Sequence, residues 1–216
     1  MKKNFTEIVF VLDESGSMED LRSDTVGGFN SLIGKQKNEE GDAVVSAVLF
    51  STESHVLYDR VPIENIGRMT EKDYCPNGGT ALLDAVGDAV RHIRNIHKYA
   101  RPDDVPEHTL FIITTDGMEN SSRKYTAQKV KSMITEQQEK YGWEFVFLGA
   151  NIDSAETAES IGIAPASAVD CFADSVGCTV QYETMSRAVS IARKGIKLSD
   201  CYEWREDADA DIRRRK

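Results

Sequence analysis

Oxygen-bearing side chains from three distant parts of the sequence form its clearest chemical pattern. Two are carboxylates and three are hydroxyls: Asp13, Ser15, Ser17, Thr80 and Asp116. Carboxylate, hydroxyl and water oxygens are the ligands that a hard cation such as Mg²⁺ prefers, in an octahedral shell at about 2.1 Å. The pattern therefore predicts a divalent-metal site, provided that the fold brings the three segments together.

The first segment, Asp13-Glu14-Ser15-Gly16-Ser17, has a spacing that suits one side of such a site. Alternate residues of an extended turn point the same way, so Asp13, Ser15 and Ser17 can share a target while Glu14 points away. Taken singly, each segment has a simpler interpretation, because Ser, Thr and Asp commonly cap helices and Gly-rich segments commonly form turns. It is the combination of the three segments that favours a metal site.

The order of these segments closely resembles that of the von Willebrand factor type A (VWA) domain, over about residues 5–195. The metal-ion-dependent adhesion site (MIDAS) of that family has the pattern DxSxS, a distant Thr and a distant Asp, and all five positions are matched here. The resemblance implies that the five residues named above are metal ligands. It is closest to stand-alone, bacterial-type members of the family.

The resemblance further implies a binding module and not an enzyme. In the family, the bound Mg²⁺ keeps an open coordination position that a Glu or Asp of a partner protein fills. Intracellular versions often serve multiprotein complexes, including complexes with ATPases, so an assembly of that kind is the expected partner. Mn²⁺ and Ca²⁺ are alternatives to Mg²⁺, since oxygen ligands suit all three ions.

A metal-dependent enzyme is the alternative interpretation. Phosphoryl-transfer enzymes of the haloacid dehalogenase type also use Mg²⁺ and place an Asp after a first buried strand, as Asp13 is placed, but their second Asp, two positions on, is Ser15 here. A nucleotide-binding enzyme is not indicated, because neither GxxxxGK[ST] nor GxGxxG follows a predicted strand. The motif segments also contain no His or Lys to serve as a catalytic base.

The fold expected around these residues is an α/β, Rossmann-like, doubly wound sheet. Buried-strand patterns alternate with helical periodicity, which favours a mostly parallel sheet with helices on both faces. Residues 51–54 join two β-rich runs, and such a short connection predicts one antiparallel edge strand. Ligands of these sheets bind beyond the carboxyl ends of the strands, where the motif segments fall. The expected strands are 6–12, 43–50, 55–61, 109–115, 143–148 and 168–171, and the expected helices are about 18–32, 80–96, 124–140, 153–160 and 175–194.

The composition is that of an acidic globular protein. The 216 residues carry 26 Lys and Arg against 36 Asp and Glu, a formal charge of −10, so a phosphate-neutralising surface for nucleic acid is not expected. No apolar stretch approaches the roughly 18 residues of a membrane helix, and the first apolar run is too short for a signal peptide. A cytoplasmic location without a membrane partner is expected.

The cysteines and the C-terminal segment complete the expected organisation. Four cysteines without a CxxC pair predict free, structural thiols, although Cys75 could border the metal site. Residues 1–198 are expected to form the VWA domain. The composition turns strongly charged after that, which predicts a mobile tail over 199–216.

Overall fold

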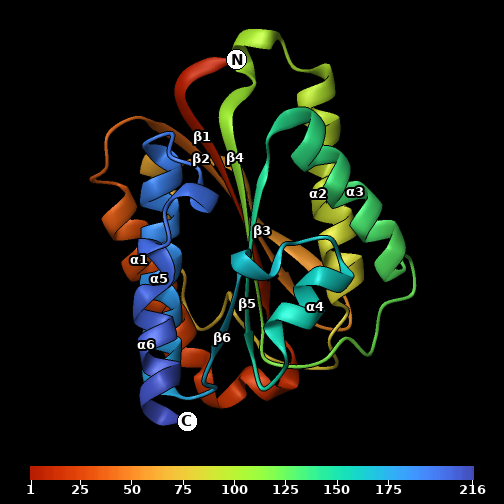
Figure 1. The fold of residues 1–216 in the computed structure, drawn as a ribbon, viewed down its shortest axis with the longest axis vertical. Coiled ribbons are helices and arrows are strands. Elements are labelled where there is room, and N and C mark those ends of the chain that lie inside the picture. The colour runs from red at the N-terminus through yellow and green to blue at the C-terminus, as the bar shows by residue number, and fades with distance from the viewer.

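The computed structural model describes residues 1–216 and shows a six-stranded sheet between two layers of helices (Figure 1). The strands are β1 (Lys2–Asp13), β2 (Asp42–Phe50), β3 (Ser54–Pro62), β4 (Pro106–Thr115), β5 (Glu144–Ala150) and β6 (Ala168–Cys171). They lie in the order β3-β2-β1-β4-β5-β6, and only β3 is antiparallel to its neighbour. The predicted α/β sheet with one antiparallel edge strand is confirmed.

The helices divide between the two faces of the sheet (Figure 1). One face is covered by α1 (Arg22–Gln36), α5 (Ser175–Arg193) and α6 (Glu206–Arg215), and the other by α2 (Leu82–Tyr99), α3 (Ala127–Tyr141) and α4 (Ser154–Ser160). A 3₁₀ helix over Gly16–Leu21 precedes α1, so the first predicted helix begins as a tighter turn than its periodicity indicates.

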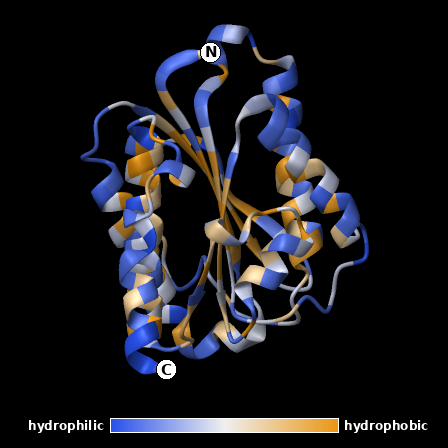
Figure 2. Cartoon of the chain, viewed as in Figure 1, coloured by the Kyte–Doolittle hydropathy of each residue, from blue (hydrophilic) through white to orange (hydrophobic).

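Strand β1 shows how the sequence supplies a core on each face. Ile8, Phe10 and Leu12 pack in the core beneath α1 and α5, while Val9 and Val11 pack in the core beneath α2 and α3. Successive side chains alternate across a strand, so one continuous apolar run can fill both cores. Figure 2 shows the result: apolar residues concentrate on the strands and hydrophilic residues on the outer sides of the helices.

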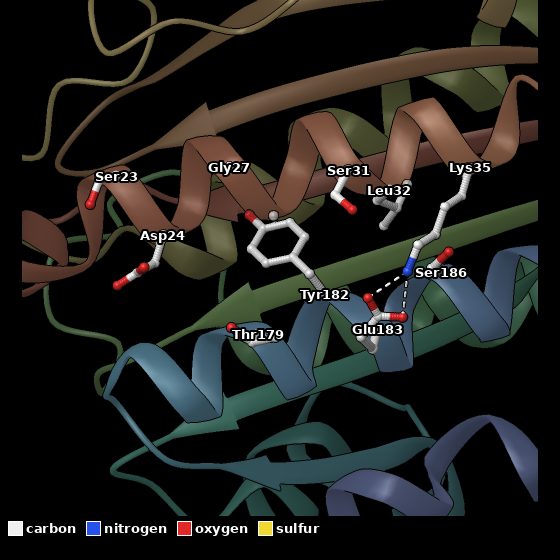
Figure 3. Close-up of a pocket in the computed structure, with 11 residues that line it drawn as sticks. Ser23, Asp24, Gly27, Ser31, Leu32, Lys35, Thr179, Tyr182, Glu183 and Ser186 are labelled. Atoms are coloured by element: carbon white, nitrogen blue, oxygen red, sulfur yellow. Dashed lines mark hydrogen bonds and ion pairs between the residues drawn. The ribbon is translucent and has the colours of Figure 1, made fainter.

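Helices α1 and α5 lie side by side, and the ring of Tyr182 on α5 points toward α1 next to Gly27 (Figure 3). A Cβ on Gly28 would lie 2.3 Å from Cδ2 of Tyr182, so only Gly leaves space for this ring. Nearby, Nζ of Lys35 lies 2.6 Å from Oε2 of Glu183 and links the two helices. Gly27 and Gly28 thus lie inside α1 without interrupting the helix.

The C-terminal segment differs from the mobile tail predicted over 199–216. Trp204 and Ala208 are buried in the core shared with α5, and Arg187 of α5 pairs with Asp207 at 2.6 Å. Through these contacts the segment, including α6, packs against α5. Among its many charged residues, Trp204 of the 3₁₀ helix Glu203–Arg205 and Ala208 of α6 are apolar and face the core.

Candidate metal centre

The carboxyl end of β1 passes into a tight turn that carries three of the five predicted ligands. The backbone N–H of Ser15 donates to Oδ1 of Asp13 (2.7 Å), and the hydroxyl oxygens of Ser15 and Ser17 lie 3.1 Å apart. Glu14 is buried and points elsewhere, since its carboxylate accepts a hydrogen bond from the N–H of Cys75. Glu14 therefore holds the neighbouring loop, and the other three residues share one side of the turn.

Asp116, which follows β4, lies against both serines. Its Oδ1 accepts a hydrogen bond from the hydroxyl of Ser17 at 2.6 Å and lies 3.5 Å from the hydroxyl oxygen of Ser15. Strands β1 and β4 are adjacent and parallel, with Leu12 paired to Thr114, so their carboxyl ends meet at one edge of the sheet. This register brings together side chains that are 99 and 101 residues apart in the sequence.

Thr80 reaches the same edge from the loop before α2. The N–H of Gly16 donates to the carbonyl oxygen of Gly78 (3.1 Å), which ties this loop to the turn after β1. The N–H of Thr80 donates to Oδ1 of Asn120 (2.9 Å). The hydroxyl oxygen of Thr80 lies 3.6 Å from the position that a Cβ on Gly117 would take. Thr80 therefore faces the turn that follows β4.

The two carboxylates are buried among neutral hydrogen-bond donors. Asp13 is 1% exposed and Asp116 is 6% exposed, and their partners are hydroxyls and one backbone N–H. Burial raises the pKa of Asp13 and the nearby Asp116 adds to that rise, while hydrogen bonds from Ser15 and Thr115 oppose it. Two buried carboxylates side by side are unfavourable when both are charged. A divalent cation held by these oxygens would offset that repulsion, so the donor set fits such an ion.

Two side chains that donate hydrogen bonds to Asp13 are hard or impossible to predict from the sequence. The hydroxyl of Thr115 donates to Oδ2 of Asp13 at 2.6 Å, and the hydroxyl of Tyr74 donates to its backbone oxygen at 2.5 Å. Burial raises the pKa of Tyr74, so this hydroxyl keeps its proton. Thr115 could be found from its place beside Asp116 at a strand end. Tyr74 stands in a loop without a pattern.

Other residues near this edge have different surroundings. Cys75 is exposed, and its sulfur lies 3.7 Å from Nη2 of Arg22, a cation beside the thiol that the sequence does not reveal. Met18 is buried in the core and Asn151 is an exposed turn residue with φ of 57°. No three His, Cys, Asp or Glu side chains form a metal-binding group anywhere in the chain. The cluster of two carboxylates and three hydroxyls is therefore the candidate.

The comparisons with known proteins identify the fold. No protein-family model matches the sequence, and no curated protein matches it significantly. The von Willebrand factor type A protein from Catenulispora acidiphila is structurally similar, with a TM-score of 0.58 and 15% identity over 84% of this chain and 42% of that one. The vWF domain of the pilus tip protein Mfa5 from Porphyromonas gingivalis has a TM-score of 0.59 and 11% identity, over 87% of this chain and 95% of that one.

Proximal thread matrix protein 1 from the mussel byssus, in a structure with a zinc-occupied MIDAS motif, is also similar. Its TM-score is 0.58 and its identity 14%, over 86% of this chain and 46% of that one. At such low identities the similarity establishes the fold alone: the chain has the fold of VWA domains. It spans less than half the length of the mussel and Catenulispora proteins. None of its own helices combines the length and apolarity that crossing a bilayer requires.

Proposed function

We propose that this protein is a divalent-cation-dependent protein-binding module. In this proposal Asp13, Ser15, Ser17, Thr80 and Asp116 hold one Mg²⁺, and an Asp or Glu of a partner protein completes its shell. The observation that carries the proposal is the approach of the two serine hydroxyls to Oδ1 of Asp116, at 2.6 and 3.5 Å, across about a hundred residues of sequence. The zinc-occupied MIDAS of the mussel protein supports it, because that protein shares the fold.

The chemistry of the donor set favours an external carboxylate as the ligand. Three of the five donors are neutral hydroxyls, so a bound dication would keep Lewis acidity for an anion from outside. Ser17 is exposed, whereas Asp13 and Ser15 are buried, so a partner would approach from the side of Ser17. The formal charge of −10 repels an acidic partner at long range, so specificity must arise from short-range contacts.

The same geometry supports a function without catalysis. Both carboxylate oxygens of Asp13 accept hydrogen bonds, from the N–H of Ser15 and the hydroxyl of Thr115, which hold the group in place as a ligand and weaken it as a nucleophile. Ser15 also stands where a dehalogenase-type phosphatase would need its second carboxylate. We propose instead that the protein binds partners during assembly of a cytoplasmic complex. An ATPase-containing complex is one candidate partner. Four free thiols are consistent with that compartment.

Calorimetric titration of Mg²⁺, Mn²⁺ and Ca²⁺ into the metal-free protein tests the metal site. We expect one site, and at least about tenfold weaker binding after Asp116→Ala or Ser17→Ala, since each substitution removes an oxygen donor. Asp20→Ala is the matched control, because Asp20 is exposed on the same segment and belongs to none of the contacts above. Unchanged metal binding by a folded Asp116→Ala variant would refute the assignment.

A further inference from the structure

A cavity adjoins the turn after β1 that carries three of the candidate metal ligands. It has a volume of about 290 Å³ and is lined by that turn, by the link between β2 and β3 and by the loop before α2. Pockets for small organic ligands usually measure about 300–1,000 Å³, so this cavity lies at the lower end of that range. Its size therefore suits a single side chain of a partner better than a whole organic ligand.

Glu14 presents a buried carboxylate to this cavity. The residue is 4% exposed, and its Oε1 accepts a hydrogen bond from the N–H of Cys75. The nearby Nδ1 of His55 lies 3.7 Å from Oε2, which is beyond hydrogen-bond distance. The unpaired side-chain atoms that are shielded from solvent all belong to other residues, so Oε2 can be reached from the cavity. A buried carboxylate oxygen in this position lacks a donor, and a charged donor suits it best.

Two further carboxylates make the lining of the cavity negative. Glu53 is exposed, and Asp73 is half-buried. The hydroxyl and the N–H of Thr70 donate to Oδ2 of Asp73 and lower the pKa of that carboxyl, so it stays charged at neutral pH. Lys72 is the one lysine or arginine among the lining residues. Three carboxylates therefore face one ammonium, and the lining attracts a further cation.

The cavity suits an organic cation better than a metal ion. Its carboxylates do not form a group that could hold a metal. A guanidinium or ammonium differs from a metal ion because it distributes several N–H donors over separate acceptors. Oδ1 of Asn77, which also lines the cavity, receives only a long contact of 3.5 Å from the hydroxyl of Ser51. Neutral and charged acceptors are thus both available to such a group.

The cavity and the candidate metal centre lie on opposite sides of one turn. Glu14 stands between Asp13 and Ser15, and successive side chains of an extended segment point to opposite sides. The N–H of Asn77 donates to the backbone oxygen of Glu14 at 2.9 Å, which fixes another wall of the cavity to the same turn. A partner segment that crosses this turn can therefore reach both sites.

We propose that this cavity binds a Lys or Arg side chain of the same partner that supplies a carboxylate to the metal. The inference rests on the proposed function and adds a second charge to the partner's contact segment. A basic residue near the acidic one would offset the long-range repulsion between the partner and a chain with a formal charge of −10. A partner surface that is only acidic would leave Glu14 without its donor, so the cavity favours segments that carry both charges.

Titration of N-ethylguanidinium, an analogue of the Arg side chain, into the metal-free full-length protein tests the cavity without the metal. NMR follows the amide signals of Cys75 and Asn77, since both N–H groups donate to Glu14. Neutral N-ethylurea, of similar shape, is the control ligand. We expect saturable binding of N-ethylguanidinium and at least about tenfold weaker binding of N-ethylurea, which cannot form a charge-assisted hydrogen bond. Equal binding of the two ligands would overturn the proposal.

Two variants with matched controls test the placement. Glu14→Gln should weaken N-ethylguanidinium binding at least about tenfold, because it keeps the shape of the side chain and removes its charge. Asp20→Asn is its control, since Asp20 is exposed on the same segment and outside the lining. If Glu14→Gln does not fold, Glu53→Gln against Glu64→Gln decides, because both glutamates are exposed and only Glu53 lines the cavity. Equal binding by the members of the deciding pair refutes the site.

The affinity of the metal-dependent partner separates this inference from the proposed function. We expect Asp116→Ala to abolish partner binding in Mg²⁺, and Glu53→Gln to weaken it at least about threefold relative to Glu64→Gln. A partner that Glu53→Gln and Glu14→Gln bind as tightly as wild type, but that Asp116→Ala loses, would overturn the cation site and leave the proposed function intact. A partner that binds equally in EDTA would refute the proposed function, and with it the joint recognition of two charges.

Discussion

Replacing Trp204 with Ala tests how the C-terminal segment is attached. The side chain is 1% exposed and packs in the core beneath α5, and truncation of such a residue costs about 3–5 kcal/mol. Its indole N–H has no hydrogen-bond partner, so the substitution also removes an unsatisfied donor, which offsets about 1 kcal/mol. We therefore expect the free energy of unfolding to fall by about 3 kcal/mol. For a chain of this length that corresponds to a melting temperature lower by about 6–12 °C.

The assay is urea unfolding followed by circular dichroism and by the fluorescence of the remaining Trp143. Tyr202→Ala is the matched control, because Tyr202 lies two residues away and is 55% exposed; we expect a change within about 0.5 kcal/mol. A loss of less than about 1 kcal/mol for Trp204→Ala would be an ordinary surface effect. That result would contradict the docking of residues 199–216 and restore the mobile tail predicted from their charge.

Three further predictions concern the metal centre and the thiols. Asp13→Asn should raise the melting temperature in EDTA, because it removes a buried charge. The variant should also lose the increase in melting temperature that added Mg²⁺ gives the wild type. A melting temperature below that of the wild type in EDTA would contradict this prediction. In the native protein, a thiol reagent should modify the exposed Cys75 first. Burial raises the pKa of Cys171 to about 12 and that of Cys178 to about 11, so both thiols should react slowly. Early labelling of either buried thiol, detected by mass spectrometry, would refute their burial in the core. The purified protein should not hydrolyse phosphomonoesters with Mg²⁺, because Ser15 replaces the second acid; turnover abolished by Asp13→Asn would favour the enzyme.

Local patterns were sufficient to predict the fold and the edge of the sheet where the candidate metal-binding residues lie. The nearly continuous apolar run that ends at Asp13 requires burial on both faces of the sheet, and such strands are typical of parallel sheets. The short link over 51–54 leaves only a hairpin, and β3 is antiparallel as predicted. Once strands are parallel, their carboxyl ends meet, so Asp13 and Asp116 had to lie close together.

The features that were not predictable depend on contacts between distant segments. The hydroxyl of Tyr74 reaches Asp13 only because the loop before α2 folds over the turn after β1. The side chains of Glu7 and His97 meet only because α2 packs on the sheet. A single Glu in an otherwise apolar strand does not indicate which residue will pair with it. The burial of Trp204 cannot be predicted from its neighbours in the sequence, because they are mostly charged and its burial depends on packing against α5.

If partner binding requires the metal, affinity capture will show that dependence. Wild type, Asp116→Ala and Asp20→Ala would be immobilised and exposed to extract of the native cell in Mg²⁺ or in EDTA. We expect a partner that wild type and Asp20→Ala retain in Mg²⁺, and that is lost in EDTA and with Asp116→Ala. Neutralising the Asp or Glu at the contact on that partner should abolish binding. A partner bound equally in EDTA, or bound with undiminished affinity after every contact carboxylate has been neutralised, would refute metal-dependent capture of a carboxylate.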